Sequence, residues 1–366
     1  MSKGTRSDRD RGTRAARDGE TVVTRRRRAL FAVLTVLFAT ALSLALAEGA
    51  VRLLDLASEV RAHFQPGIFA PDPDLGWVLK PSYRGLRLED DRRVPTSTNT
   101  LGFRGPDWVE TRRRAAVRLL ALGDSSTFGL GVADDETYPA YLEKSLREGG
   151  RDAAVFNAGV PGYETAREAE IFRRLAPIVG PHIVIVTWLS NDVARWPVAD
   201  ERRVQVLDGY LVDDVDRYIA WRERIDHRSI YASAFYRFMR VRVRLVRDRL
   251  GMRHRSWSQT INPEKFRSTT DALLKIKREA DALGAAVVLV TLPRREQVEG
   301  SVGASDLSYL AEFGRSHGME VVEPLSLWKR PGGESRPRFL NDNVHLTAHG
   351  YRGLAEAIAG AASLQR

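Results

Sequence analysis

The sequence predicts an α/β protein, in which helices cover both faces of a parallel β-sheet, preceded by one transmembrane helix. Short apolar segments alternate with longer segments of helical spacing over residues 117–362, and this alternation is typical of βαβ units. The apolar segments are continuous rather than alternating, as expected for strands buried on both faces. A single uncharged stretch near the N-terminus predicts the membrane helix.

The composition is that of a globular protein with a sizeable core. The chain has 366 residues, of which 43% are hydrophobic and 28% charged, so global disorder is excluded. There are no cysteines. A disulfide framework, a cysteine nucleophile and cysteine-ligated zinc are therefore excluded as well.

Most of the excess positive charge lies in an N-terminal tail, residues 1–28. This tail holds ten Lys/Arg and four Asp/Glu, which accounts for +6 of the net charge of +10. Because the excess is local, a nucleic-acid partner has no support from the rest of the chain. We expect no nucleic-acid binding.

Residues 29–47 (ALFAVLTVLFATALSLALA) carry no charge and would span roughly 28 Å as a helix, about the thickness of a bilayer core. Four arginines, Arg25 to Arg28, precede this stretch, whereas Glu48 and Asp55 follow it. The positive-inside rule then places the tail in the cytoplasm and the rest of the chain outside. The predicted location is a single-pass protein of the cell membrane.

Two interpretations of this helix compete. Ala45-Leu46-Ala47 fits a small-x-small signal-peptidase site, and cleavage after Ala47 would release a soluble exported protein. However, the apolar stretch is longer than the usual apolar region of a signal sequence, and its pattern continues into EGAVRLLDL. We favour an uncleaved signal anchor, and both interpretations place the bulk of the chain outside the cytoplasmic membrane.

Residues 48–116 are expected to form an extracytoplasmic connector. From residue 63 onward this segment is rich in Pro, Gly, Asp and Arg and has few periodic apolar segments. Such composition favours irregular structure with, at most, short strands.

The alternating pattern begins at residue 117. Five apolar segments predict strands, at 117–123, 153–159, 182–190, 285–293 and 319–324. Four segments of helical spacing stand between or after them, at 138–150, 163–180, 263–284 and 349–364. In a parallel sheet of this kind, ligands bind beyond the carboxyl ends of the strands.

Residues 195–262 interrupt the alternation and are rich in Arg, Tyr and Trp. We interpret them as a solvated helical insertion whose long side chains cover apolar surface. Two alternatives stay open, a lid over the site and a surface that lies against anionic lipid.

Four short motifs follow predicted strand ends or precede the last helix. Each alone is ordinary turn or capping chemistry, but chance is a poor explanation for all four in this order. They are Gly123-Asp124-Ser125-Ser126, the segment Asn157 to Gly162, Ser190-Asn191-Asp192, and Asp342-Asn343-Val344-His345.

These motifs resemble the four blocks of the SGNH hydrolases, also called GDSL-like esterases and lipases. The resemblance covers residues 117–362 and implies a three-layer α/β/α sandwich with a flavodoxin-like parallel sheet. It also implies a Ser-His-Asp catalytic triad and an oxyanion hole. By position, Ser125 matches the nucleophile, Asp342 and His345 match the acid and the base, and Gly162 and Asn191 match the second-block and third-block residues.

Two positions depart from the family pattern. Ser126 stands where the family often has Leu, so two serines are adjacent. Ser190 stands before Asn191 where the family commonly has Gly. Neither departure touches the triad. We expect Ser125 to direct its hydroxyl into the site and Ser126 to point elsewhere.

The chemistry agrees with the resemblance. A serine hydroxyl needs a base within hydrogen-bond reach, and imidazole is suited to that role at neutral pH. A carboxylate three residues before the histidine can fix its tautomer. The backbone N–H groups of Ser125 and Gly162 and the amide of Asn191 would then form the oxyanion hole.

The chain contains no motif for metal, nucleotide or nicotinamide chemistry. There is no His-Glu-x-x-His, no phosphate-binding Walker loop and no Gly-x-Gly-x-x-Gly after the first strand, so no metal and no cofactor are expected. The Gly-x-Ser-x-Gly elbow of the α/β-hydrolases is also absent.

The sequence thus predicts a membrane-anchored, extracytoplasmic serine esterase that acts through an acyl-enzyme. An acylated cell-envelope polysaccharide, O-acetylated for example, is the expected kind of substrate. Two alternatives stay open. The same triad could transfer an acyl group to a cell-envelope glycan, or the chain could be a catalytically inactive, tethered binding module.

Overall fold

The computed structural model describes most of the chain. The described residues are 7–54, 56, 67–89, 92–190, 204–212, 215–216, 218–220, 232–249, 263–329, 338–340 and 343–365. The chain separates into two compact units, one of residues 1–58 and 230–240 and the other of residues 59–229 and 241–366.

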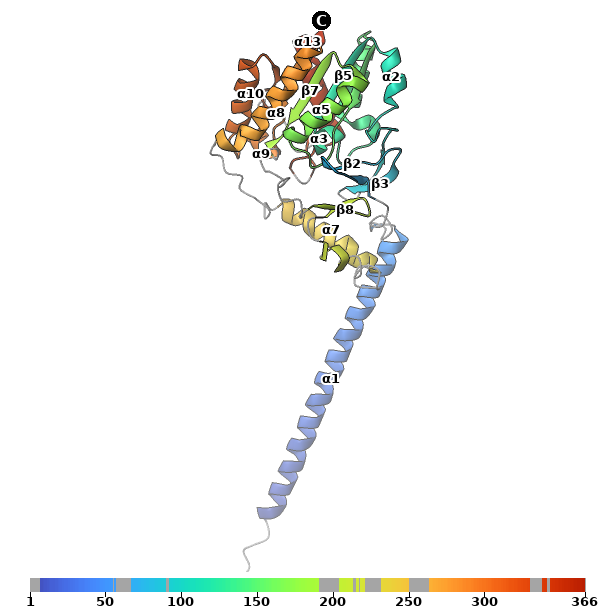
Figure 1. Cartoon of the computed structure of the whole chain (residues 1–366). Helices are drawn as coiled ribbons and strands as arrows, with labels where there is room; N and C mark the ends of the chain where they lie inside the picture. Colours follow the sequence, from blue (N-terminus) through green and yellow to red (C-terminus); the bar gives the residue numbers. More distant parts are fainter. Residues whose placement is uncertain are drawn as a thin grey trace, which may run out of the picture. The chain divides into compact units, whose positions relative to one another are not determined.

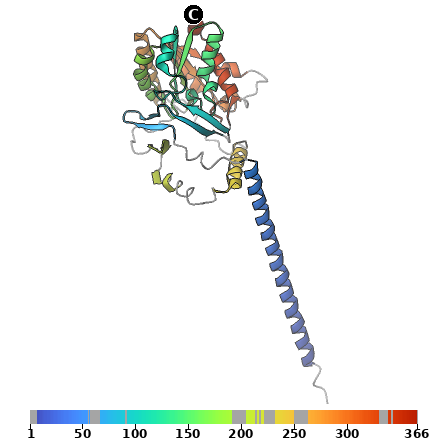
Figure 2. The same cartoon turned by 90° about the vertical axis from the view of Figure 1, so that its right-hand side faces the viewer.

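The first unit is dominated by the helix α1, Ser7–Leu53, which continues unbroken through the predicted membrane segment (Figure 2). In the described part of the chain, its portion Arg27–Leu53 is the one helical stretch long and apolar enough to cross a membrane. A signal sequence near the N-terminus has the same properties.

The second unit contains a five-stranded sheet made of the five predicted strands. Its order is β11-β10-β7-β5-β6, and every neighbouring pair is parallel. Read from β6, the chain order is 2-1-3-4-5, which is the flavodoxin-like order. The predicted sheet is therefore confirmed. The strands are β5 (Val117–Gly123), β6 (Ala153–Asn157), β7 (Ile183–Trp188), β10 (Ala286–Thr291) and β11 (Glu320–Val322).

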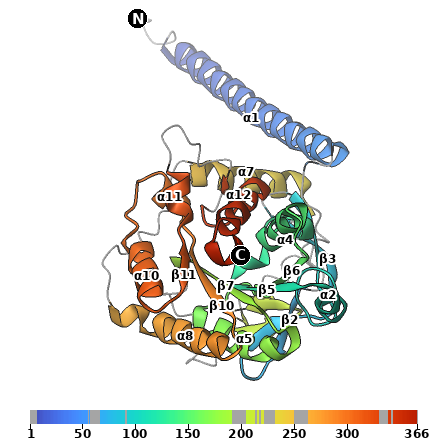
Figure 3. The same cartoon turned by 90° about the horizontal axis from the view of Figure 1, so that it is seen from above.

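Helices cover both faces of the sheet, which gives the three-layer sandwich (Figures 1 and 3). One face packs on α2 (Trp108–Arg114), α5 (Thr165–Val179), α8 (Pro263–Ala282) and α10 (Ser305–Ser316). The other packs on α4 (Tyr138–Glu148), α9 (Arg295–Val298), α11 (Pro324–Trp328), α12 (Ala348–Ala359) and α13 (Ala362–Gln365).

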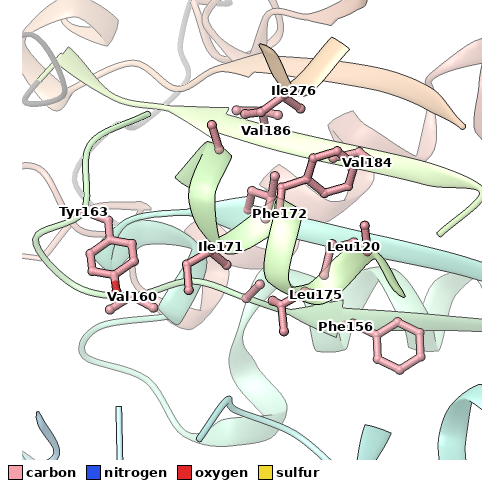
Figure 4. Close-up of a cluster of buried hydrophobic side chains, with 14 of the residues drawn as sticks. Leu120, Phe156, Val160, Tyr163, Ile171, Phe172, Leu175, Val184, Val186 and Ile276 are labelled. Atoms are coloured by element: carbon pink, nitrogen blue, oxygen red, sulfur yellow. The ribbon is translucent and has the colours of Figure 1, made fainter. Parts of the chain in front are cut away.

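The larger core lies between the sheet and α5. Phe172 and Leu175 of α5 pack on Leu120 and Val184 of the two central strands (Figure 4). All four side chains are buried, as expected for parallel strands with apolar residues on both faces.

The segment expected to be an irregular connector contains more structure than its composition indicated. Trp77, Leu79 and Trp108 of this segment are buried in the same core as the central strands. Short strands and turns leave little periodicity in a sequence, which is why the pattern was not recognised. The elements are α2 and the hairpins β1 (Phe69–Asp72) with β2 (Gly76–Leu79) and β3 (Arg84–Glu89) with β4 (Arg92–Ser97).

Three elements of the insertion 195–262 are described. A small antiparallel hairpin joins β8 (Gln205–Leu207) and β9 (Tyr210–Val212). In its turn, Asp208 O accepts a hydrogen bond from Gly67 N and Gly209 O accepts one from Phe69 N. The third element is the helix α7, Ala234–Arg249.

Candidate active site

Ser125 begins the short helix α3, Ser125–Phe128, directly after β5. The Asp124 carboxylate caps this helix by accepting a hydrogen bond from Ser126 N at 2.8 Å. Gly123 is required here, because an added Cβ would lie 2.1 Å from Thr127 Oγ1. A capping aspartate and a glycine at close quarters thus place the serine at the carboxyl edge of the sheet.

The structure brings Ser125 and His345 together. Ser125 Oγ lies 2.7 Å from His345 Nε2, although the two residues are 220 positions apart in the sequence. This is a normal hydrogen-bond distance, at which an imidazole can accept the hydroxyl proton during nucleophilic attack. A longer contact of 3.4 Å joins Ser125 Oγ to Asp124 Oδ2.

The neighbouring serine has a different environment. Ser126 is completely buried, and its Oγ has no hydrogen-bond partner among the described residues. Its backbone N–H is the donor that Asp124 accepts. Of the two adjacent hydroxyls, the one of Ser125 therefore meets the histidine.

His345 lies on a short loop before α12, and this loop is held from the side of α9 through Asn343. Arg295 donates from its backbone N to Asn343 O at 3.0 Å and from Nη1 to Asn343 Oδ1 at 2.9 Å. Asn343 Nδ2 in turn donates to Glu296 Oε1 at 3.2 Å. Asn343 has a φ of +65°, a conformation that asparagine tolerates better than most residues. Leu340 N then donates to His345 O at 2.7 Å.

The loop from Asn157 to Gly162 packs against the turn that bears Ser125. Val160 N donates to Gly123 O at 3.1 Å. A Cβ added to Gly159 would lie 2.1 Å from Phe128 N, so glycine allows the two backbones to touch. Gly162 has a φ of +84°.

An aromatic side chain from the predicted connector and an aliphatic side chain from the insertion lie beside Gly162. A Cβ at this glycine would lie 3.2 Å from Trp77 Cζ2 and 3.8 Å from Leu211 Cδ1. Trp77 comes from β2 and Leu211 from β9. The connector and the insertion therefore both contribute to the surroundings of this loop.

A buried arginine holds the far end of α3. The Arg104 guanidinium, 2% exposed, donates to the carbonyl oxygens of Phe128, Gly129 and Val132 at 2.8–3.0 Å. It also forms an ion pair with Asp134 at 2.6 Å. Asp134 belongs to a 3₁₀ turn, Asp134–Glu136. Arg104 thus connects the short helix that begins with Ser125 to the segment before β5.

A hydroxyl network joins α3 to the rest of the sandwich. Tyr138 Oη lies 3.3 Å from Thr127 Oγ1 and 2.9 Å from Thr187 Oγ1. Burial raises the pKa of Tyr138 to about 12, so its hydroxyl stays neutral and can bridge α3 and β7.

Glu168 of α5 is a buried acid whose carboxyl group interacts electrostatically with Asp124, the residue before Ser125. The residue is 1% exposed, and neither carboxyl oxygen has a hydrogen-bond partner within the described residues. Burial, followed by the charges of Asp124 and Glu164, raises the pKa of Glu168 well above its ordinary value. Its carboxyl group is therefore held in the neutral form.

Two predicted site residues, Asn191 and Asp342, lie outside the described residues. Their neighbours in the chain are placed. Ser190 follows β7, the strand next to β5, and Asn343 begins the loop that carries His345. β5 and β7 are also the strands at which the sheet order changes direction, the position where proteins of this architecture bind ligands.

Among the described residues, no group of three or more His, Asp or Glu side chains is arranged to hold a metal ion. The residues that are brought together, a serine and a histidine, are suited to acyl transfer.

Fold and site together define the protein as an α/β enzyme with a serine–histidine pair at the sheet edge. Residues 121–352 match the GDSL-like Lipase/Acylhydrolase family. The match covers more than half of the chain, and the chain belongs to this family of ester hydrolases.

Several solved structures are similar to this chain at low identity. A lipase/acylhydrolase from Enterococcus faecalis is 16% identical, with a TM-score of 0.40, and the match covers 66% of this chain and 93% of that one. LAE5, an α/β hydrolase enzyme from a lake metagenome, is 17% identical with a TM-score of 0.43, and coverage is 70% and 98%. A catalytic mutant of Axe2, an acetylxylan esterase from Geobacillus stearothermophilus, is 14% identical with a TM-score of 0.39, and coverage is 67% and 93%. No curated protein matches the sequence.

Sequence reasoning did not find Arg104, Glu168 or the Asn343–Arg295 contact. Arg104 stands in a segment with many arginines, and nothing in its spacing distinguishes it. Asn343 offered one usable signal, since asparagine in a short loop favours positive φ.

Proposed function

We propose that this protein is a serine esterase in which Ser125 is the nucleophile and His345 the general base. The single observation that supports the proposal most strongly is the 2.7 Å contact between Ser125 Oγ and His345 Nε2. Asp342, three residues before the histidine, would hold the imidazole through Nδ1. The backbone N–H groups of Ser125 and Gly162 and the Asn191 amide would bind the oxyanion.

The reaction then follows from this geometry. His345 Nε2 accepts the proton as Ser125 Oγ attacks the ester carbonyl, and a tetrahedral oxyanion forms. The imidazolium returns its proton to the leaving alcohol as the C–O bond breaks, which leaves an acyl-Ser125 ester. Water attacks this ester in the same way, releases the acid and restores the serine.

The proposed setting is the outer face of the cytoplasmic membrane, with α1 kept as an uncleaved anchor. The four arginines before the apolar stretch support this orientation. The length of the apolar stretch, which carries no charge from residue 29 to residue 47, supports an anchor over a cleaved signal. Because polysaccharides of the cell envelope carry O-acyl groups on that side, we propose O-acetylated carbohydrate as the substrate class.

The test is a panel of short-chain and glycan acetyl esters given to the full chain in detergent, with Ser125→Ala as the matched control. We expect acetate release by the wild-type chain and none by the variant. Competing acceptors, water and deacylated glycan, separate hydrolysis from acyl transfer in the same assay. Ester formation on the glycan as the main product would contradict hydrolysis, and no turnover of any ester would favour a binding module.

A further inference from the structure

The end of α1 is bonded to the start of α7 within one compact unit. The Glu48 carboxylate accepts hydrogen bonds from Ser233 Oγ at 2.7 Å and from the backbone N–H groups of Ala234 and Phe235 at 2.9 and 2.8 Å. Arg52 pairs with the same carboxylate at 2.6 Å. Glu48 thus caps α7 and compensates the positive end of that helix.

Glu48 is also the first charged residue after the apolar stretch 29–47. In a spanning helix, such a residue lies where the hydrocarbon core meets the headgroups. Leu53, the last residue of α1, and Leu54, which follows it, are apolar and exposed, at 86% and 63%. The first turn of α7 is therefore fixed at the level of the membrane surface.

The exposed face of α7 has the pattern of a helix that lies in a bilayer interface. Met239, Val243 and Val246 are 39%, 50% and 51% exposed. At 3.6 residues per turn these positions fall within about 60° of arc, so they form one apolar stripe. Arginines that are also exposed stand on either side of the stripe, Arg242 on one side and Arg240 and Arg247 on the other.

The charge of α7 separates it from an ordinary solvated helix. Its sequence carries six arginines and one aspartate, whereas α8 carries five Lys/Arg and four Asp/Glu. A solvated face usually mixes both signs, as α8 does. An apolar stripe bordered by arginines matches the headgroup and acyl-chain boundary of an anionic membrane.

We propose that α7 is an interfacial helix whose Met239–Val243–Val246 stripe inserts into the anionic phospholipid surface of the membrane that α1 crosses. This inference rests on the proposed anchoring by α1. Its consequence for function is that the enzyme is held to the membrane by two elements rather than by one tether. The surface that it fits is phospholipid, not protein.

The absence of cysteine from the chain allows a direct test. Single cysteines at Val243 and Val246, labelled with an environment-sensitive fluorophore, are placed in the full chain in lipid nanodiscs. The discs contain acyl-chain-brominated lipid as a quencher, with phosphatidylcholine alone or with about 30 mol% phosphatidylglycerol added. Leu37→Cys in the middle of α1 reports anchoring. Leu283→Cys, whose exposure of 52% matches that of the valines, is the control outside α7.

We expect quenching at Val243 and Val246 to exceed that at Leu283 about threefold in the phosphatidylglycerol discs, and to weaken in phosphatidylcholine alone. Replacing Arg240, Arg242 and Arg247 together by Gln should reduce quenching in the anionic discs to the level of the neutral ones. Quenching at Leu37 without quenching at the two valines would overturn the inference and leave the anchor intact. Equal quenching in both kinds of disc would overturn the claim that α7 prefers an anionic lipid surface. No quenching at Leu37 would contradict the anchor itself, and the interfacial helix with it.

Discussion

The two halves of the Ser125–His345 pair are held in different ways. Ser125 follows a buried strand, and Arg104, Tyr138 and the Asn157–Gly162 loop all fix the turn from inside the core. His345 lies half-buried on a loop held mainly by Asn343, through contacts with α9. The serine is thus part of the folding core, whereas the histidine side chain lies at the edge of that core.

This difference predicts different consequences of mutation. Changes behind Ser125 should lower stability first and activity as a consequence. Changes at the His345 side chain should lower activity while the chain stays folded, because stability is not uniform across a structure and this side chain is only half-buried.

His345→Ala should have the largest effect on the reaction. We expect a loss in kcat/KM of about 10³-fold or more, because the serine loses its base. The thermal unfolding midpoint should change little. Ester hydrolysis and circular-dichroism melting measure the two quantities. His349→Ala, at an exposed position on α12, is the matched control and should retain activity. A His345 variant within tenfold of wild type would contradict the assignment of the base.

Arg104→Leu should have the largest effect on stability. The variant leaves Asp134 and three backbone carbonyls without their buried donor, and we expect the free energy of unfolding to fall by about 3–5 kcal/mol. Chemical denaturation measures this change. Arg173→Leu, which breaks an exposed ion pair with Glu170, is the control and should cost much less than Arg104→Leu. Equal costs at the two positions would contradict the role of Arg104.

Asn343 variants should separate backbone strain from side-chain contacts in the base loop. Asn343→Gly keeps the positive φ but loses the bonds to Arg295 and Glu296, whereas Asn343→Ala loses both. We expect kcat to fall about tenfold in either variant, with Ala less stable than Gly by about 1 kcal/mol. Wild-type kcat in both variants would show that these contacts do not position His345.

Glu168→Gln should have the smallest effect, and it should be stabilising. The raised pKa of Glu168 means that the folded chain keeps a proton that the unfolded chain releases above pH 4.5. The free energy of unfolding therefore falls as the pH rises from about 4.5 toward the raised pKa. The amide removes this loss, so we expect the variant to be more stable than wild type at pH 8 and almost equal to it at pH 4. Glu312→Gln, on the exposed side of α10, should change neither value, and a pH-independent difference would contradict the neutral carboxyl.

Much of the sandwich could be predicted from the sequence because its strands are continuous apolar segments. The segments at 117–123 and 182–190 were recognisable for this reason, and the structure confirms them as β5 and β7. The hairpins between residues 69 and 97 were not recognisable. Their strands are short, and Pro, Gly and Asp residues interrupt the sequence around them.

Part of the site was predictable because ligand-binding residues of a parallel sheet lie beyond the carboxyl ends of its strands. A motif after β5 and a motif before α12 could be expected to meet, and Ser125 and His345 do lie within hydrogen-bond distance. The supporting residues were not predictable, because an arginine such as Arg104 acquires its role from three carbonyls that only the folded chain brings together. The roles of Asp342, Asn191 and Gly162 stay predictions.

The most direct test of the central claim is the site of covalent modification by a fluorophosphonate, read by peptide mass spectrometry in the wild-type chain and in Ser125→Ala and Ser126→Ala. Because Ser125 Oγ meets His345 and Ser126 Oγ is buried, the account predicts one adduct, on Ser125. It should vanish in Ser125→Ala and persist in Ser126→Ala, whose turnover should fall about tenfold or less. An adduct on Ser126, or labelling that survives Ser125→Ala, would contradict the assignment of the nucleophile.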